Sequence, residues 1–240
     1  MSEACLSVIV PALDAAATLP ATLAALEAAR EGGLLREVLV VDGGSGDETV
    51  AVAERWGARV LKVAANRGAQ LAAGGAAATG DWLLFLHADT RLGPGWVAAA
   101  RAFMARAGSE RPGSERPGSD QRAAAFRLVL DDSDPRARRV ERLANWRGRA
   151  LGLPYGDQGL LIARGFYQAL GGHRPLPLME DVALARRIGR RRIVILDAEA
   201  VTSAARYRKG GWWLRPLRNL ALLGLYFLGV PPRLLRRLYG

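Results

Sequence analysis

Residues 6–42 decide the fold, and they read LSVIVPALDAAATLPATLAALEAAREGGLLREVLVVD. The stretch contains two short and mostly apolar runs, LSVIV at residues 6–10 and EVLVV at residues 37–41. Such runs are typical of strands that are buried on both faces of a parallel sheet. Between them lies an Ala- and Leu-rich segment, which predicts a helix over residues 18–30 with Thr18 as its cap. The stretch therefore predicts a strand–helix–strand unit.

The same alternation continues further along the chain. Strands that alternate with helices of this length indicate a parallel, doubly wound α/β sheet. The further predicted elements are a helix at 47–56, a strand at 59–63, a helix at 69–78, a strand at 82–87, a strand at 123–130 and a helix at 135–151.

Length and composition exclude several classes of protein. Half of the 240 residues are hydrophobic and 24% are charged, which excludes a disordered or collagen-like chain. The single cysteine, Cys5, excludes a disulfide framework and a cysteine-cluster metal site, and it fits a reducing, cytoplasmic setting. The start of the chain lacks the features of a signal peptide. The longest apolar run near the end, residues 220–230, is shorter than the ~20 residues that a spanning helix needs.

Positive charge gathers at the end of the chain. The net charge is +11, and residues 201–240 account for +8 of it, because they contain no Asp or Glu. Such a tail fits a polyanionic partner, although no recognised nucleic-acid module accompanies it, so we expect no nucleic-acid partner. Aromatic and leucine side chains alternate with the arginines, which fits peripheral contact with a membrane surface. A helix that packs on its own domain, or on a second copy in a homodimer, is the alternative.

Three carboxylates follow predicted strands. Asp14 comes after the first strand, Asp42 ends the second and Asp89 ends the fourth. In open α/β sheets, ligands bind in the crevice at the carboxyl ends of the strands, so we expect the three to share one rim of a binding site. Each alone could instead be a turn or helix-capping residue. No GxGxxG loop and no GxxxxGK[ST] motif occurs, which argues against a dinucleotide-binding domain and a P-loop enzyme.

Five segments, taken in order, share their wording with one enzyme family. They are SVIVPALDAAATLPATLAAL, EVLVVDGGSGDETVAVAERWGARVL, NRGAQLAAGGAAATGDWLLFLHADT, YGDQGLLIAR and PLMEDVALARRI. Together they resemble the family 2 glycosyltransferases with the GT-A fold, over about residues 5–200. Among subgroups they look most like small bacterial enzymes labelled arsenosugar-biosynthesis or radical-SAM/selenodomain-associated glycosyltransferases. That label describes genomic context and implies little about the acceptor.

A tandem repeat at residues 108–119 divides the chain into two halves. The repeat, GSERPGSERPGS, is polar and rich in Pro and Gly, which predicts a mobile surface loop. We expect one GT-A domain at residues 1–204 and a basic, amphipathic helical tail at residues 205–240. Within the domain we expect a nucleotide-binding half at 1–107, the repeat loop at 108–122 and an acceptor-side half at 123–204.

The resemblance assigns residues to the nucleotide-sugar donor. Asp42 would accept a hydrogen bond from the base, while Arg67 would reach the diphosphate, for which a guanidinium fork is suited. A solvated arginine near a helix end is the alternative for Arg67. The full set of implied donor-binding residues is Pro11, Ala12, Asp14, Asp42, Arg67, His87 and Ala88.

The resemblance also implies a divalent metal ion. Asp89 occupies the last position of the family's DxD motif, which holds Mg²⁺ or Mn²⁺ against the diphosphate. These hard cations are commonly held by one or two carboxylates together with substrate phosphates. This sequence departs from the motif at its first acidic position, which is His87. A neutral imidazole can still reach a ribose or phosphate, and a strand-end histidine without a ligand role is the alternative.

On the acceptor side, Glu180 and Asp181 match the family's ED motif. Inverting transfer needs a base that takes the proton of the acceptor hydroxyl, and we assign that catalytic role to Asp181, with Glu180 shaping the site. Acidic residues in the first turn of a helix are the alternative for both. The resemblance places the acceptor against a loop formed by Gly156, Asp157 and Gln158.

The sequence thus predicts an inverting glycosyltransferase that uses Mg²⁺ or Mn²⁺ to move a sugar from a nucleotide-sugar to a small-molecule or lipid-linked acceptor. A nucleotidyltransferase is one alternative, and it would release pyrophosphate rather than a nucleoside diphosphate. A catalytically inert, membrane-peripheral protein that binds nucleotide-sugars is the other alternative, because His87 replaces an acid and the tail is basic.

Overall fold

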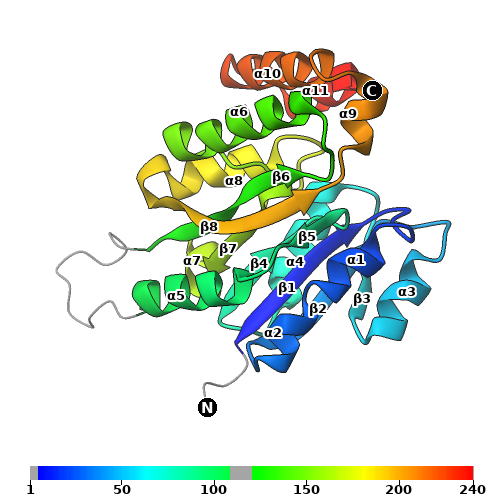
Figure 1. Ribbon diagram of the computed structural model, residues 1–240, viewed down its shortest axis with the longest axis vertical. Helices are drawn as coiled ribbons and strands as arrows, with labels where there is room; N and C mark the ends of the chain where they lie inside the picture. Colours follow the sequence, from blue (N-terminus) through cyan, green and yellow to red (C-terminus); the bar gives the residue numbers. More distant parts are fainter. Residues whose placement is uncertain (1–4, 109–120, 240) are drawn as a thin grey trace.

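The computed structural model describes residues 5–108 and 121–239, and an eight-stranded sheet forms its centre (Figure 1). The predicted repeat loop therefore lies almost wholly outside the described residues. The order of the strands in the sheet is β3-β2-β1-β4-β7-β6-β8-β5. The strands are β1 (Leu6–Ala12), β2 (Leu35–Asp42), β3 (Arg59–Lys62), β4 (Trp82–Phe85), β5 (Thr90–Leu92), β6 (Ala123–Leu130), β7 (Leu160–Ala163) and β8 (Ile193–Thr202).

Helices cover both faces of this sheet (Figure 1). A short 3₁₀ turn, η1 (Gly156–Gln158), precedes β7, and a second, η2 (Arg190–Arg192), precedes β8. The helices are α1 (Leu19–Ala24), α2 (Glu27–Glu31), α3 (Thr49–Trp56), α4 (Arg67–Ala77), α5 (Trp96–Gly108), α6 (Pro135–Leu151), α7 (Arg164–Ala169), α8 (Glu180–Ile188), α9 (Ala205–Gly210), α10 (Leu214–Phe227) and α11 (Pro232–Tyr239).

The sheet is mostly parallel, as predicted. β1 pairs in parallel with β2 and β4, and β2 pairs in parallel with β3. β7 is antiparallel to both β4 and β6, while β6 and β8 are again parallel to each other. The edge strand β5 is antiparallel to β8. The carboxyl ends of β1, β2, β4, β6 and β8 therefore point toward one edge of the sheet.

The continuous apolar runs are explained by burial on both faces. Along β1, Val8 and Val10 belong to the core that contains α1 and α5, whereas Ile9 belongs to the core that contains α4, α7 and α8. Successive residues of a strand point to opposite faces, so a strand between two helical layers is apolar at nearly every position. The exception in β1 is Ser7, whose hydroxyl donates to the Glu37 carboxylate at 2.8 Å. All seven residues of β1 are buried.

Two local expectations from the sequence are wrong. The single helix predicted over residues 18–30 is two short helices, α1 and α2, and the Thr18 hydroxyl donates to the Ala15 carbonyl instead of capping α1. The first strand does not end before Pro11 but continues to Ala12. Beyond Ile9 it pairs with β2 alone, so the missing N–H of Pro11 breaks no ladder with β4.

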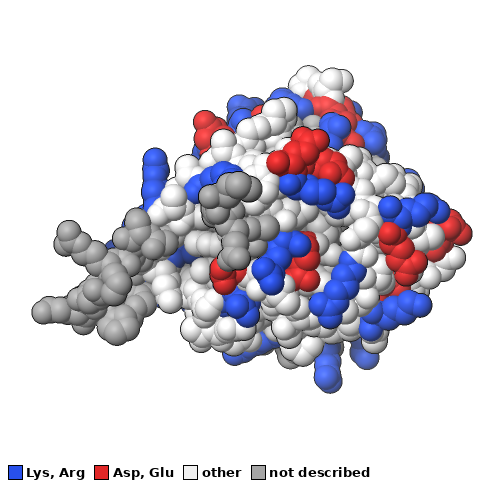
Figure 2. Space-filling view, turned by 90° about the horizontal axis from the view of Figure 1, so that it is seen from below, with Lys and Arg blue, Asp and Glu red and all other residues white. Residues whose placement is uncertain are grey.

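The tail packs on its own domain, which was one of the two alternatives. Leu222 and Leu223 of α10 and Leu235 of α11 are buried against Met179 and Val182, at the start of α8. Figure 1 shows α10 and α11 beyond α6, at the top of the view. The opposite face of the molecule carries acidic and basic side chains intermingled (Figure 2). None of the helices in the described part of the chain is long and apolar enough to cross a membrane.

Candidate active site

The first part of the site is the loop edge at the ends of β1 and β2. Asp14 has a positive φ of 48°, and its Oδ1 accepts a hydrogen bond from the Gly46 N–H at 2.9 Å. Asp42 is buried, and its carboxylate accepts the N–H groups of Gly44 and Ser45 at 3.0 and 3.2 Å. Both carboxylates thus hold the turn at residues 43–46 in place between the two strands.

The other residues predicted to bind the nucleotide-sugar pack beneath this loop edge. Pro11 and Ala12 are buried at the carboxyl end of β1. Ala88 is also buried, and its carbonyl accepts a hydrogen bond from the Thr22 hydroxyl at 3.0 Å. The Gln70 side chain donates to the carbonyl of Ala12 at 2.9 Å, which fixes the end of β1. These residues build the floor of the predicted donor site.

A cavity of about 380 Å³ opens at the carboxyl edge beside β4, β6 and β8. Asp89, Asp157 and Asp181 line it together with Arg67 and His87, so two loops and two helix starts bring their predicted site residues to one space. The described residues that line this cavity include neither of the two aspartates at the ends of β1 and β2.

Arg67 and Glu180 form an ion pair that joins two helix N-termini. Arg67 begins α4, whose cap is Asn66, and Glu180 begins α8 after Met179, which has a φ of 64°. The Arg67 Nε donates to the Glu180 carboxylate, which is completely buried. Burial raises the pKa of Glu180, and the adjacent Arg67 guanidinium opposes that effect. The pair fixes the position of Arg67 at the cavity wall.

His87 is neutral in this environment. Burial and the positive charges of Arg67 and Arg206 hold the pKa of its imidazole well below the ordinary value. Its Nε2 lies 3.4 Å from Arg67 Nη1, and a guanidinium can only donate. Nε2 is therefore the acceptor, which leaves the proton on Nδ1, 3.9 Å from Asp89 Oδ1.

The two acceptor-side carboxylates are held differently. Asp181 accepts the Gly156 N–H on Oδ2 at 2.9 Å and the Val182 N–H on Oδ1 at 2.8 Å, so its orientation is fixed by backbone. Asp157 Oδ1 is buried and has no hydrogen-bond partner among the described residues. Burial raises the pKa of Asp157, the nearby Arg147 opposes this, and the charges of Asp181 and Asp89 raise it further.

The loop at residues 156–158 only partly faces the cavity. Gly156 and Asp157 line it, and a Cβ at position 156 would overlap the Nε2 atom of His87. Gln158 is 0% exposed, and its side-chain amide donates to the Phe126 carbonyl at 3.0 Å. Gln158 therefore anchors the loop to β6, and the structure does not bring it to the cavity with the other two.

The side chains fit a metal ion that is completed by substrate, and not a preformed protein cage. No group of three or more His, Cys, Asp and Glu residues suitable for a metal occurs within residues 5–108 and 121–239. Among the residues that the structure describes, the Asp89 carboxylate has only long contacts, of 3.9 Å each, with His87 and Arg206, so it is available to a cation. One carboxylate plus donor phosphates is an ordinary environment for Mg²⁺ or Mn²⁺.

Sequence reasoning missed Arg147, which also lines the cavity. Its Nε donates to the Leu153 carbonyl at 2.8 Å, and its guanidinium lies 3.4 Å from the centre of the Tyr155 ring. Its Nη2 is buried and has no hydrogen-bond partner in the described part of the chain. Helical periodicity could have found it, because Val140, Ala144 and Arg147 fall on one face of α6.

The strand order and the helices on both faces of the sheet belong to the GT-A class of α/β folds. Similar folds occur in glucosyl-3-phosphoglycerate synthase from Mycobacterium tuberculosis in complex with Mn²⁺, UDP and glucosyl-3-phosphoglycerate (TM-score 0.56, 20% identity, 83% of this chain and 70% of that chain). They also occur in S. aureus TarS 1–349 (TM-score 0.62, 16% identity, 83% of this chain and 60% of that chain). These likenesses confirm the predicted fold.

The particular family follows from the sequence comparison. The sequence model described as glycosyl transferase family 2 matches residues 7–147, and the chain belongs to this family, as predicted. The curated relatives include the PGL/p-HBAD biosynthesis glycosyltransferases of Mycobacterium tuberculosis and Mycobacterium bovis. They are 38% identical over 105 residues, which cover 38% of this chain and 38% of each relative. The chain thus spans little more than a third of their length.

Proposed function

We propose that the protein is an inverting glycosyltransferase that moves a sugar from a nucleotide-sugar to a hydroxyl acceptor with Mg²⁺ or Mn²⁺. The observation that carries the proposal is the cavity at the carboxyl edge, where Asp89, Asp157 and Asp181 meet Arg67. The complexes of the M. tuberculosis synthase with Mn²⁺ and UDP support a donor of this class. The likeness to the arsenosugar-biosynthesis subgroup belongs to the same proposal and does not identify the acceptor.

On the donor side, Asp89 would hold the metal ion together with the phosphates of the donor. The bound ion would act as a Lewis acid that stabilises the leaving nucleoside diphosphate. Arg67, positioned by Glu180, donates hydrogen bonds to the same diphosphate. His87 is neutral, so it places no positive charge beside the metal ion. The loop held by Asp14 and Asp42 receives the nucleoside.

On the acceptor side, Asp181 is the general base. Its carboxylate is oriented by two backbone N–H groups, which leaves further lone pairs for the acceptor hydroxyl. The hydroxyl oxygen attacks the anomeric carbon as its proton passes to Asp181, and the nucleoside diphosphate leaves from the opposite face. Asp157 binds the acceptor beside it, and it is the second candidate for the base because its pKa is raised.

Titration of UDP with and without Mn²⁺ tests the proposal. We expect Mn²⁺ to tighten UDP binding in the parent protein, and we expect Asp89→Asn to remove that effect without unfolding the chain. Asp81→Asn is the matched control, because Asp81 is a surface carboxylate on the preceding turn with a side chain 79% exposed. Equal UDP affinity with and without metal in the parent would contradict the assignment of Asp89.

The reaction products separate the alternatives. With UDP-glucose and Mn²⁺, slow transfer to water or to added acceptors should release UDP. Release of pyrophosphate in the presence of UTP and a sugar phosphate would identify a nucleotidyltransferase. Metal-dependent binding of UDP without turnover of any nucleotide-sugar would identify an inert binding protein.

A further inference from the structure

The cavity does not end at the carboxylates but continues as a groove between α6 and α10. Six large apolar side chains line this groove, and each of them is 43–64% exposed. Apolar side chains scattered over a surface need no explanation, but a contiguous set in one concave groove marks a binding surface. The six groove residues are Leu143, Trp146, Leu151, Trp213, Leu217 and Leu220.

The packing of the tail does not require these side chains. α10 buries Leu222 and Leu223 against the domain, whereas Trp213, Leu217 and Leu220 repeat at intervals of four and three residues along another face. Residues at this spacing form one stripe on a helix. The stripe is thus separate from the buried leucines of α10, although the Trp213 ring also lies 5.5 Å from the Arg139 guanidinium of α6. It lines the same cavity as Asp157 and Asp181.

The charge of the cavity is a second constraint on the ligand that it can bind. Six arginines line it against three aspartates, so the cavity carries net positive charge. Arg67 is already paired with Glu180, whereas Arg147 Nη2 is buried with no hydrogen-bond partner among the described residues. A buried guanidinium N–H without a partner favours a ligand that supplies an anionic oxygen.

We propose that the acceptor is an anionic amphiphile. Its head carries the reacting hydroxyl and an anionic group, which lie beside Asp181 and Arg147, and its apolar chain lies in the groove between α6 and α10. This inference rests on the proposed function, because it specifies the acceptor of the same site. Simple adsorption to a membrane explains the observations less well, because the most exposed leucine of the tail, Leu228 at 82%, lies outside the cavity.

Binding of n-alkyl phosphates, below their micelle concentrations and with UDP and Mn²⁺ present, tests the inference. Trp146 and Trp213 line the groove, so their fluorescence reports occupancy without any turnover. We expect decyl phosphate to bind at least ~30-fold more tightly than butyl phosphate, because its extra methylenes are removed from water. Decyltrimethylammonium should bind at least ~10-fold more weakly than decyl phosphate, because its head group is cationic. Equal affinity for both chain lengths, or for both heads, would overturn the proposal.

Two variants locate the binding. The double variant Leu217→Gln/Leu220→Gln should lose most of the advantage of the longer chain, whereas Leu228→Gln should keep it. An equal loss in both would show general adsorption to the tail and would overturn the proposal. A parent dimer that dissociates in the double variant would show that a second copy covers the groove, which would also overturn it. The UDP titration is independent of the groove, so intact Mn²⁺-dependent UDP binding shows that only this inference has failed.

Discussion

Asp157 and Asp181 share one cavity, and the structure gives them different constraints. Asp181 is fixed by two backbone N–H groups, whereas Asp157 Oδ1 is buried with no hydrogen-bond partner among the described residues. A base must be aligned with one proton, while a binding group can adapt to its ligand. This difference supports Asp181 as the base and Asp157 as a contact to the acceptor.

Replacing each carboxylate by its amide tests these roles. Asp181→Asn should lower turnover at least ~100-fold, the lower range of a general-base contribution, and leave UDP affinity unchanged. Asp157→Asn should mainly raise the KM for the acceptor. Nucleoside diphosphate release, measured against acceptor concentration, gives both quantities. If Asp157→Asn lost turnover and Asp181→Asn kept it, the two roles would have to be exchanged.

His173 provides a test of pH dependence. It is buried against Phe85 and hydrogen-bonded to the Tyr167 hydroxyl, and burial lowers the pKa of its imidazole to about 3. The unfolded chain takes up this proton near pH 6.5, while the fold keeps the ring neutral. The free energy of unfolding should therefore decrease as pH falls below 6.5, by up to about 1.4 kcal/mol per pH unit.

Urea unfolding at pH 7 and pH 5 measures this effect. His173→Asn keeps a hydrogen-bond acceptor near the Tyr167 hydroxyl and removes the titrating ring, so the variant should lose about 2 kcal/mol less than the parent between the two pH values. The comparison uses the change with pH in each protein, which removes any constant cost of the substitution. Equal changes in both proteins would show that His173 does not titrate in this way.

Residue types could be predicted from the sequence better than residue surroundings. The sequence predicted that Asp14, Asp42 and Asp89 would share one rim, but of these three Asp89 alone lines the cavity. There it meets Asp157, Asp181, Arg67 and His87, to which the family resemblance gave separate roles. Gln158 could not be placed in the same way, because its burial depends on a free carbonyl of β6. That carbonyl is free only because a neighbouring strand is short, which no local pattern in the sequence reveals.

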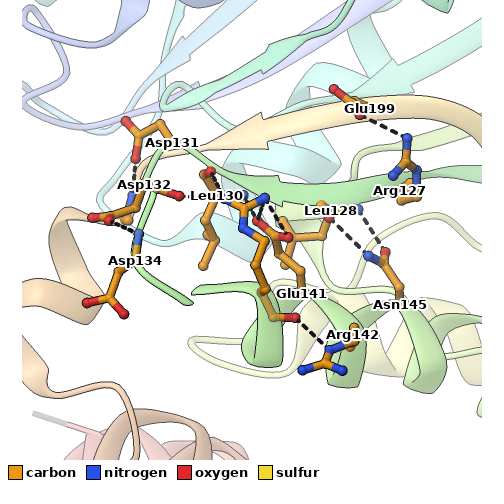
Figure 3. A network of polar contacts seen from close by, with 12 residues as sticks. Arg127, Leu128, Leu130, Asp131, Asp132, Asp134, Glu141, Arg142, Asn145 and Glu199 are labelled. Carbon is orange, nitrogen blue, oxygen red and sulfur yellow. Dashed lines mark hydrogen bonds and ion pairs between the residues drawn. The ribbon is translucent and has the colours of Figure 1, made fainter. Parts of the chain in front are cut away.

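At the scale of elements, α6 completes the hydrogen bonding of β6. β7 pairs with β6 only at Ala123 and Ala124, which leaves backbone groups further along that side of β6 without a strand partner. The Asn145 side chain accepts from the Leu128 N–H and donates to the Leu128 carbonyl, at 2.8 and 3.0 Å (Figure 3). Glu141 accepts the Leu130 N–H at 2.7 Å. Side chains of a helix thus replace the missing strand.

Removing this replacement should be costly. Asn145→Leu leaves a buried N–H and a buried carbonyl of Leu128 unpaired, so we expect a loss of about 2–4 kcal/mol in the free energy of unfolding. Arg142→Ala is the control on the same helix, because Arg142 is exposed and, in the described part of the chain, its side chain donates a hydrogen bond only to the Arg138 carbonyl one turn back. Its effect should stay within about 0.5 kcal/mol. Similar losses in both variants would show that Asn145 is not a special contact.

The elements with long patterns could be predicted best. β6 and α6 have the predicted bounds, because a mostly apolar run of eight residues and a 17-residue amphipathic helix each carry a strong signal. The three-residue β5 is too short for a periodic pattern, and the four-residue β7 also went unpredicted. The break between α1 and α2 also has no breaker residue at Ala25 or Leu26, so tertiary packing must decide it.

At the scale of the whole molecule, the tail is part of the core. Leu235 is completely buried, and its neighbour Leu234 is half-exposed. Leu235→Ala should lower the free energy of unfolding by about 2–5 kcal/mol, as for other buried leucines, whereas Leu234→Ala should have little effect. Chemical denaturation of the two variants measures the difference. Equal and small effects would show that the tail folds or detaches independently of the domain.

The order of the strands bears on how this protein could recombine with its relatives. β5 belongs to the first half of the chain but pairs at the far edge with β8, and β7 of the second half lies next to β4 of the first. A chimera joined within residues 109–120 would therefore match β4 and β5 of one parent to β7 and β8 of another. Exchanging the second half alone should therefore not transfer acceptor preference, unless the residues that pair β4 with β7 and β5 with β8 are exchanged as well. The two halves of this chain would therefore be inherited together.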